Sequence, residues 1–257
     1  MRAIILGSGS KGNSTLLIGN NKKILIDVGF SYPKMLMNLK TYDVSPSDID
    51  AILITHTHSD HIGGLASVVK KISSPVFIKE ELYKDIKKII PEDNIVVVEE
   101  KFTINDFDIE VINASHDVPA FGFIINDGKK KILYLTDTGY INRRYYPLIK
   151  DLDLYIIESN HDEKMLMEGP YPYILKQRVI SDKGHLSNRY TGKCLNKSIG
   201  DKTKYIILAH LSENNNTPEL AYEQIKDELK DNEYFDESKI IIAKQHEETE
   251  MVEIWLR

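Results

Sequence analysis

The chain has 257 residues, of which 42% are hydrophobic, with a net charge of −6 and a single cysteine, Cys194. This length and composition suit one α/β domain or two small ones with a large buried core. A single cysteine excludes an internal disulfide. The negative net charge excludes a surface that is basic throughout, but it does not exclude a local basic groove. No apolar run approaches the roughly 20 residues that span a bilayer, and residues 1–20 lack the apolar centre of a signal peptide, so we expect a cytoplasmic protein without membrane contact.

Short runs rich in β-branched and aliphatic residues predict strands along the whole chain. They lie at residues 3–6, 15–18, 23–27, 51–55, 76–78, 95–98, 107–113, 121–125, 131–136, 154–158, 205–209, 239–243 and 250–256. Helical patterns lie between some of them, at residues 62–72, 80–90 and 218–230, the last with Pro218 at its first position after Thr217. The turn at 126–128 predicts a hairpin of the two strands beside it. Because there is no repeat, linker or low-complexity tract, this mixed order predicts a single α/β domain over residues 1–257.

Histidines and an aspartate gather directly after the apolar strand at 51–54. Within the sequence THTHSDH at residues 55–61, the candidate ligands are His56, His58, Asp60 and His61. Alternate residues of an extended segment point the same way, so the first two can chelate one ion while the others turn toward a second. Imidazole and carboxylate suit zinc, manganese or iron. The alternative is a polar loop whose histidines are fortuitous, which this spacing makes hard to accept.

A cage for two metal ions needs further donors, and these must come from other parts of the chain because one short peptide cannot surround a metal. Candidates stand after three other predicted strands: His116, Asp137 and His210. Each one alone would more often cap a loop or a turn. Together with the first cluster they predict a centre for two divalent ions.

These seven residues, in this order, resemble the pattern of the metallo-β-lactamase superfamily, whose members fold as a four-layer αββα sandwich. The resemblance implies that one ion is bound by His56, His58 and His116, the second by Asp60, His61 and His210, and both by Asp137. It also implies a role for Asp27, in the sequence LIDVG, which would orient ligands and loop rather than bind metal. Such support is physically needed because a ligating imidazole donates its other nitrogen to an acceptor. An ordinary turn residue is the alternative.

Further stretches resemble the YycJ (WalJ) group of exonucleases within that superfamily. They are GSGSKGNS at 7–14, ESNHD at 158–162, GPYP at 169–172, LKQR at 175–178, SDKGHLSN at 181–188 and HLSENN at 210–215. This resemblance implies a 5′ to 3′ exonuclease acting on DNA with a free 5′ end, with a role in mismatch repair and unknown protein partners. The insertion that carries the second domain of the RNA-processing β-CASP members is missing, which argues against RNA maturation of that kind.

The segment 176–197 is locally basic, with six basic residues and one acidic residue in an acidic chain. Lys176, Arg178, Lys183 and Arg189 are our candidates for contacts with DNA phosphates. Nearby tyrosines at 171, 173 and 190 could stack on unpaired bases. A solvated loop with core tyrosines is the competing interpretation.

The glycine- and serine-rich loop at 7–14 could offer its backbone and side chains to a phosphate, although tight turns use the same residues. We expect substrate contacts from Ser8, Ser10 and Asn13 in this loop.

Two further histidines, His161 and His185, lie in motifs of the exonuclease group but outside the seven ligands. We expect His185 to hold the scissile phosphate or protonate the leaving oxygen, and His161 to support that site or reach a metal. A satisfied buried histidine is the alternative for both. Asp60 is a candidate catalytic residue as well as a ligand, and His246 is expected at the surface.

Other functions remain open at this point. A small-molecule ester or cyclic-phosphodiester hydrolase would use the same metals without the basic segment, and a third possibility is a module that binds DNA ends without cutting them. A redox di-iron protein fits less well, since those relatives have Glu in place of His58.

Overall fold

The computed structural model describes residues 1–19, 22–244, 249 and 251–254. Its residues form two compact units, the first of Met1–Val111, Asn126–Lys129 and Lys244–Arg257, the second of Ile112–Ile125 and Lys130–Ala243. A single domain over residues 1–257 stays a prediction. Among the described residues, no helix is both long and apolar enough to cross a bilayer.

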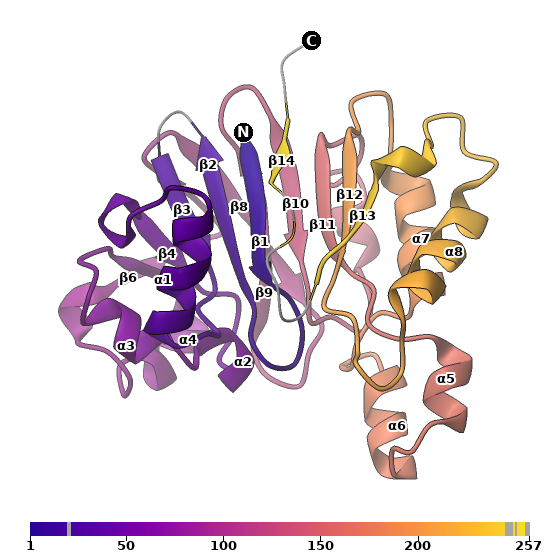
Figure 1. Cartoon of the computed structure of the whole chain (residues 1–257), viewed down its shortest axis with the longest axis horizontal. Coiled ribbons are helices and arrows are strands. Elements are labelled where there is room, and N and C mark those ends of the chain that lie inside the picture. The colour runs from indigo at the N-terminus through magenta and orange to yellow at the C-terminus, as the bar shows by residue number, and fades with distance from the viewer. Residues whose placement is uncertain (20–21, 245–248, 250, 255–257) are drawn as a thin grey trace. The chain divides into compact units, whose positions relative to one another are not determined.

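The first unit contains a seven-stranded sheet in the order β14-β1-β2-β3-β4-β5-β6 (Figure 1). Its strands are β1 (Arg2–Gly7), β2 (Ser14–Gly19), β3 (Lys22–Ile26), β4 (Ala51–Leu53), β5 (Val76–Lys79), β6 (Ile95–Val98) and β14 (Val252–Glu253). Its helices are α1 (Tyr32–Thr41), α2 (Ser59–Ile62), α3 (Leu65–Val69) and α4 (Glu80–Ile86). Short connections join β1 to β3, which pair antiparallel, whereas helices connect β3 to β6, which pair in parallel.

The strands β7 (Lys101–Ile104) and β8 (Phe107–Ala114) form an antiparallel hairpin, and β8 runs on into the second unit. They begin a second seven-stranded sheet of order β13-β12-β11-β10-β9-β8-β7. Its other strands are β9 (Ala120–Asn126), β10 (Lys131–Leu135), β11 (Leu154–Glu158), β12 (Tyr205–Ala209) and β13 (Ile240–Ile242), and β10 to β13 are parallel.

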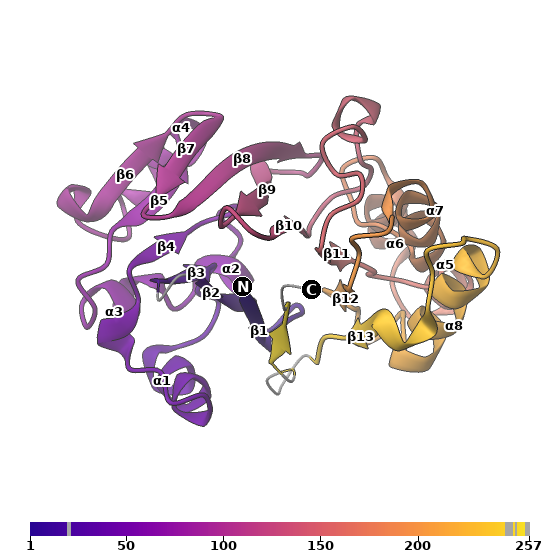
Figure 2. The ribbon, with the colours of Figure 1, turned by 90° about the horizontal axis from the view of Figure 1, so that it is seen from above.

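The helices of the second unit are α5 (Glu163–Glu168), α6 (Tyr173–Ile180), α7 (Asn188–Ser198) and α8 (Pro218–Leu229). Helices α7 and α8 lie side by side in both views (Figures 1 and 2). They share one core with the parallel strands, in which Leu195 of α7 and Ile225 of α8 are buried. The side chain of Thr217 accepts a hydrogen bond from the first turn of α8, as its position before Pro218 predicts.

The predicted strands are observed within a few residues, apart from the last, of which the structure shows only Val252–Glu253 and part of which lies outside the described residues. The prediction missed β7, α1, α5, α6 and α7. It also placed one helix at 62–72, where the chain forms α2, two glycines and α3. His246, expected at the surface, lies outside the described residues.

The segment that follows β4 is held by backbone hydrogen bonds to neighbouring loops. Asn13 N–H donates to the carbonyl of Asp60 at 2.7 Å, Val28 N–H to that of His61 at 2.7 Å, and Gly29 N–H to that of Asn13 at 2.9 Å. A Cβ atom at position 29 would lie 1.9 Å from the Asp60 carbonyl oxygen and 2.5 Å from the Asn13 nitrogen. Only glycine therefore fits where these three segments meet.

We expect Gly29→Ala to destabilise the first unit by about 3 kcal/mol or more, because the added methyl group meets backbone that cannot move aside. Urea denaturation followed by circular dichroism measures the loss. The matched control is Gly128→Asn, where nothing lies within 4 Å and φ is +82°, which Asn tolerates. Equal stability of the two variants would contradict this account of the loop.

Candidate metal centre

In the first unit, four predicted ligands directly follow the strand β4. His56 and His61 are buried, whereas His58 and Asp60 are partly exposed. The rings of His56 and His61 lie with centroids 4.0 Å apart, and those of His56 and His58 lie 4.8 Å apart. The short helix α2 turns the chain after His58, which brings Asp60 and His61 back toward the same cluster.

The buried carboxylate of Asp27 fixes this cluster from behind. It follows β3, the strand parallel to β4, so both residues 27 and 55 leave the sheet at the same edge. The Asp27 carboxylate accepts hydrogen bonds from Thr55 N at 2.8 Å, Thr55 Oγ1 at 2.8 Å and His61 Nδ1 at 2.7 Å. Burial raises the pKa of Asp27, and the neighbouring His61 opposes that rise. With its proton held at Nδ1, His61 would present the lone pair of Nε2 to a metal ion.

The side chain of Asn13, predicted to contact substrate, is buried against the same residues. Its amide nitrogen donates to Asp60 Oδ2 at 3.1 Å and lies 2.9 Å from His61 Nε2. It also donates to the carbonyl of Gly9, while Gly9 N–H donates back to its side-chain oxygen. The structure thus joins the 7–14 loop to the ligand segment through Asn13. In the same loop Ser8 is buried and Ser10 is exposed.

In the second unit, three acidic or imidazole side chains stand at the ends of neighbouring parallel strands. Asp137 follows β10, Glu158 ends β11, and His210 follows β12. The carboxyl ends of parallel strands share one edge of a sheet, where ligand-binding residues collect. Together with His185 they form a group whose potential ligand atoms all lie within 4.8 Å of one another.

The buried Glu158 carboxylate organises this group. Its Oε1 accepts from Nδ1 of His185 and Nδ1 of His210, both at 2.8 Å, and its Oε2 accepts from the backbone of Thr138 and Leu186. Burial alone would raise the pKa of Glu158, but the charge of His185 and the hydrogen bonds from His185 and His210 hold that pKa well below its usual range. Burial would lower the pKa of His185, but Glu158 raises it.

His116, after β8, belongs to the same neighbourhood. Its ring lies 5.2 Å from that of His185, which lies 5.3 Å from that of His210, measured between centroids. The carbonyl of Gly184 accepts from His116 Nδ1 at 3.3 Å. Burial lowers the pKa of His116, so the neutral, ligating form is favoured.

The backbone adopts a left-handed conformation at three of these positions. The φ angles are 60° at Asp27, 56° at Asp137 and 56° at His210, each directly after a strand or one residue later. A non-glycine residue in this region costs roughly 1–2 kcal/mol. Strained backbone conformations of this kind cluster at functional sites, where side chains must point in a fixed direction. A metal site requires such fixed directions of its ligands.

The remaining predicted residues lie in the second unit. His161 is buried, and burial lowers its pKa to about 4. On α6, Lys176 Nζ donates to the carbonyl of Met167 at 2.6 Å, and Arg178 pairs with Asp117. Arg189 on α7 pairs with Glu228 at 3.4 Å, and Lys183 between the two helices is exposed.

Two residues that hold the ligands were not assigned this role from the sequence. Glu158 was identified only as part of a shared motif, and Thr55 only as a neighbour of the ligands. Glu158 ends an apolar strand that is parallel to β10 and β12, the strands before the predicted ligands Asp137 and His210. Thr55 follows an apolar strand that is parallel to the strand before Asp27. These positions are the signal that could have identified both residues.

The donor set fits divalent metal ions. All predicted ligand atoms are imidazole nitrogens or carboxylate oxygens, most of them buried. In four of the histidines Nδ1 is bound by the chain itself, by Thr55 for His56, Asp27 for His61, Gly184 for His116 and Glu158 for His210. This arrangement sets the tautomer in which Nε2 binds a metal.

Comparisons with known proteins agree with these features. Residues 22–210 match the model of the beta-lactamase superfamily domain. The chain is 39% identical over 234 residues to the exodeoxyribonuclease WalJ of Streptococcus pneumoniae, covering 88% of this chain and 87% of the relative. It is 37% identical over 224 residues to the exodeoxyribonuclease YycJ of Bacillus anthracis, covering 84% of each.

Among solved structures, the metallo-β-lactamase fold protein YhfI from Bacillus subtilis superposes with a TM-score of 0.72 at 19% identity, over 96% of this chain and 98% of that one. This likeness concerns the fold, two mixed sheets flanked by helices, and it confirms the predicted αββα sandwich. The family match covers most of the chain, and imidazoles and carboxylates are paired at the strand ends. The chain therefore belongs to the β-lactamase superfamily.

Proposed function

We propose that this chain is a metal-dependent DNA exonuclease that cleaves phosphodiester bonds from a free 5′ end. The observation that carries the proposal is the set of buried imidazoles and carboxylates fixed at the strand ends of each unit, in a chain 39% identical to an exodeoxyribonuclease over most of its length. A role in DNA repair and a cytoplasmic location stay predictions.

The seven predicted ligands would hold two divalent ions, for which zinc, manganese and iron all suit the donors. His56, His58 and His116 would bind one ion, Asp60, His61 and His210 the other, and Asp137 both. Ions bound in this way lower the pKa of a coordinated water and neutralise charge on the phosphoryl oxygens. The task of Asp27, Thr55 and Glu158 is then to keep the imidazoles in the ligating tautomer.

His185 differs from the ligands around it because its side chain is about one-fifth exposed. Glu158 holds its Nδ1 at 2.8 Å, and in the proposed mechanism the Nε2 proton would then face the bound substrate. An imidazole in this position can protonate the oxygen that leaves phosphorus. The proposal assigns it that role, with Glu158 as the residue that positions it.

The direct experiment is to load the protein with manganese or zinc and to offer single- and double-stranded DNA labelled at either end. Early release of a labelled nucleotide from the 5′ end supports the proposal. Cleavage of short esters or cyclic phosphodiesters without cleavage of DNA would favour a small-molecule hydrolase instead. Binding of DNA ends by the metal-loaded protein without any product would favour a non-cleaving module.

Replacing Asp137 should remove both metals, since it is proposed as the shared ligand. We choose Asp137→Asn because Asn tolerates the left-handed backbone there, so the loss of charge is the main change. Metal analysis should fall from about two ions per chain to less than one, whereas His116→Ala should mainly empty one site. Asp151→Asn, also left-handed at φ 53°, is the control that keeps both ions. Full occupancy in Asp137→Asn would contradict the assignment.

His185→Ala should keep both metals and the fold, because Glu158 retains its bonds to His210, Thr138 and Leu186. Turnover on DNA should fall roughly 10²- to 10⁴-fold, the usual range for one acid–base group. A nitrophenyl phosphodiester has a leaving group that needs no proton, so the defect should largely disappear there. If both substrates suffer equally, the imidazole holds the phosphate instead.

Among the basic candidates, Lys183 is exposed, and its ammonium group makes no ion pair or hydrogen bond within the part of the chain that the structure describes. If it contacts a phosphate, Lys183→Gln should flatten the slope of log affinity against log salt by about one counterion. Lys176 and Arg178 would first have to release Met167 and Asp117, so their effects should be smaller. Lys71→Gln, an exposed change in the first unit, is the control. An unchanged slope for Lys183→Gln would mark the segment as a solvated loop.

A further inference from the structure

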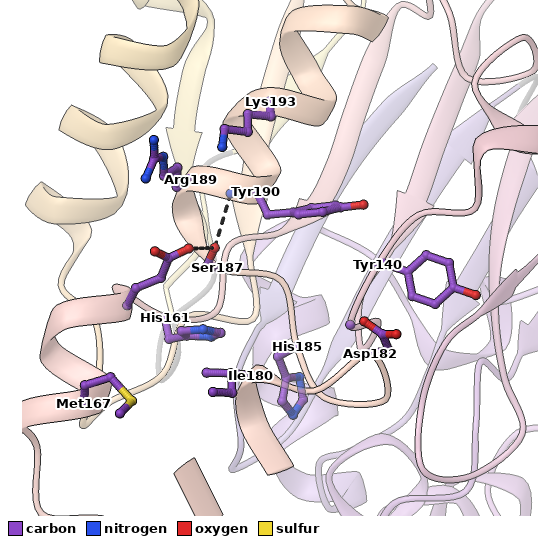
Figure 3. A pocket seen from close by; sticks show the side chains of 12 residues that line it. Tyr140, His161, Met167, Ile180, Asp182, His185, Ser187, Arg189, Tyr190 and Lys193 are labelled. Atoms are coloured by element: carbon purple, nitrogen blue, oxygen red, sulfur yellow. Dashed lines mark hydrogen bonds between the residues drawn. The ribbon is translucent and has the colours of Figure 1, made fainter. Parts of the chain in front are cut away.

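The second unit contains a cavity of about 430 Å³ beside His185 (Figure 3). This volume lies within the range of roughly 300–1,000 Å³ that is usual for small-molecule sites. One wall comes from α7, which contributes Arg189, Tyr190 and Lys193, and His161 lies below that helix in the view. We propose that this cavity receives one unpaired nucleobase, from a nucleotide beside the bond that is cut. The inference rests on the proposed function and names how its substrate is recognised.

The position of His185 connects the cavity to the reaction. Its ring lines the cavity, and its Nδ1 is bound to Glu158, which also holds the predicted ligand His210. Whatever fills the cavity therefore lies next to the group that would protonate the leaving oxygen. In a DNA strand, only a nucleotide flanking the cleaved phosphodiester can occupy that place.

The charges of the cavity favour a base over a phosphate. Arg189 and Lys193 are matched by two carboxylates that also line it, Glu163 and Asp182. A phosphate group placed inside would meet both carboxylates as well as the cations. A neutral base does not suffer this repulsion. Lys193, which makes no ion pair among the described residues, can serve the adjoining phosphate, and Arg189 can join it only on leaving Glu228.

Apolar side chains offer the surface on which a base would stack. Met167 on α5 is 48% exposed, and Ile180 at the end of α6 is 44% exposed, although both face a cavity rather than a flat surface. Tyr140 and Tyr190 line the same space. Aromatic rings and the thioether of methionine stack favourably on a nucleobase, and stacking of this kind does not depend on which base is bound.

The polar edge of the base would meet His161. This residue is 2% exposed, and its Nδ1 has no hydrogen-bond partner in the part of the chain that is described. A buried nitrogen without a partner is costly. Because His161 lines the cavity, a small rotation of its ring would let a base edge supply the missing hydrogen bond. Because burial keeps the imidazole neutral, it can serve as donor or acceptor toward different bases.

The test compares single-stranded oligonucleotides in which one residue is an abasic tetrahydrofuran analogue that keeps every phosphate. With the metal-loaded enzyme, an abasic residue at the terminal or the second position should lower kcat/KM about 5- to 150-fold relative to the same analogue placed eight nucleotides inward. Filling the cavity with Ile180→Trp should bring this ratio close to one and lower kcat/KM on the normal strand. Ile174→Trp, on the same helix but 84% exposed and outside the cavity, should keep the wild-type ratio.

The inference is overturned if the enzyme digests DNA but is indifferent to a missing base at both positions, or if Ile180→Trp keeps the full discrimination. Absence of cleavage on every oligonucleotide overturns the exonuclease itself. The two failures are thus distinguished within one set of reactions.

Discussion

Burying a charged carboxylate costs several kcal/mol of free energy unless hydrogen-bond donors replace the water that it loses. Asp27 and Glu158 both have no exposed surface, and each is surrounded by donors from backbone and side chains. Those donors include the Nδ1 atoms of His61 for the first carboxylate and of His210 for the second. The need to satisfy these two acids therefore fixes the imidazoles, and the loops that carry them, in the orientation that a metal ion requires.

Each unit meets that need with the same construction, built from its own strands. Parallel neighbours end at one edge, a carboxylate stands at or just past one strand end, and an imidazole from the next segment reaches back to it. The backbone helps in both: Thr55 N–H donates to Asp27, and Leu186 and Thr138 N–H donate to Glu158. Because His61 and His210 are each hydrogen-bonded to one of these buried carboxylates, replacing either histidine also removes a hydrogen bond that its unit needs.

The sequence was informative where chemistry and periodicity coincide within a short stretch. The pattern of His56 to His61 after an apolar strand predicted a metal-binding segment, and the order of all seven candidate ligands carried the resemblance that implied the fold, without any contact information. Glu158 could not be assigned in this way, because its partners lie 27 and 52 residues further along the chain. Asn13 shows the same limit, since its amide meets Asp60 across 47 residues, a contact that only the folded chain defines.

Helix α7 was missed for a different reason. It contains Gly192, Thr191 and two asparagines, which have low helical propensity. The helix depends instead on the Ser187 side chain, which accepts a hydrogen bond from Tyr190 N–H, and on burial of Leu195 against the core that it shares with α8. Tertiary packing thus outweighs local preference, and a reading of local propensity cannot detect it.

The left-handed residues Asp27, Asp137 and His210 have a consequence for how this protein responds to selection. At Asp137 and His210, glycine or asparagine would relieve the backbone while removing a proposed metal ligand. At Asp27 the same change would leave the buried donors of Thr55 and His61 without their acceptor, so it would destabilise the fold as well. A laboratory selection for thermal stability alone would therefore enrich variants that are folded and more stable but catalytically inactive. Only a selection that also demands turnover would preserve Asp137 and His210, so the presence of these two residues separates a working enzyme from a merely durable scaffold.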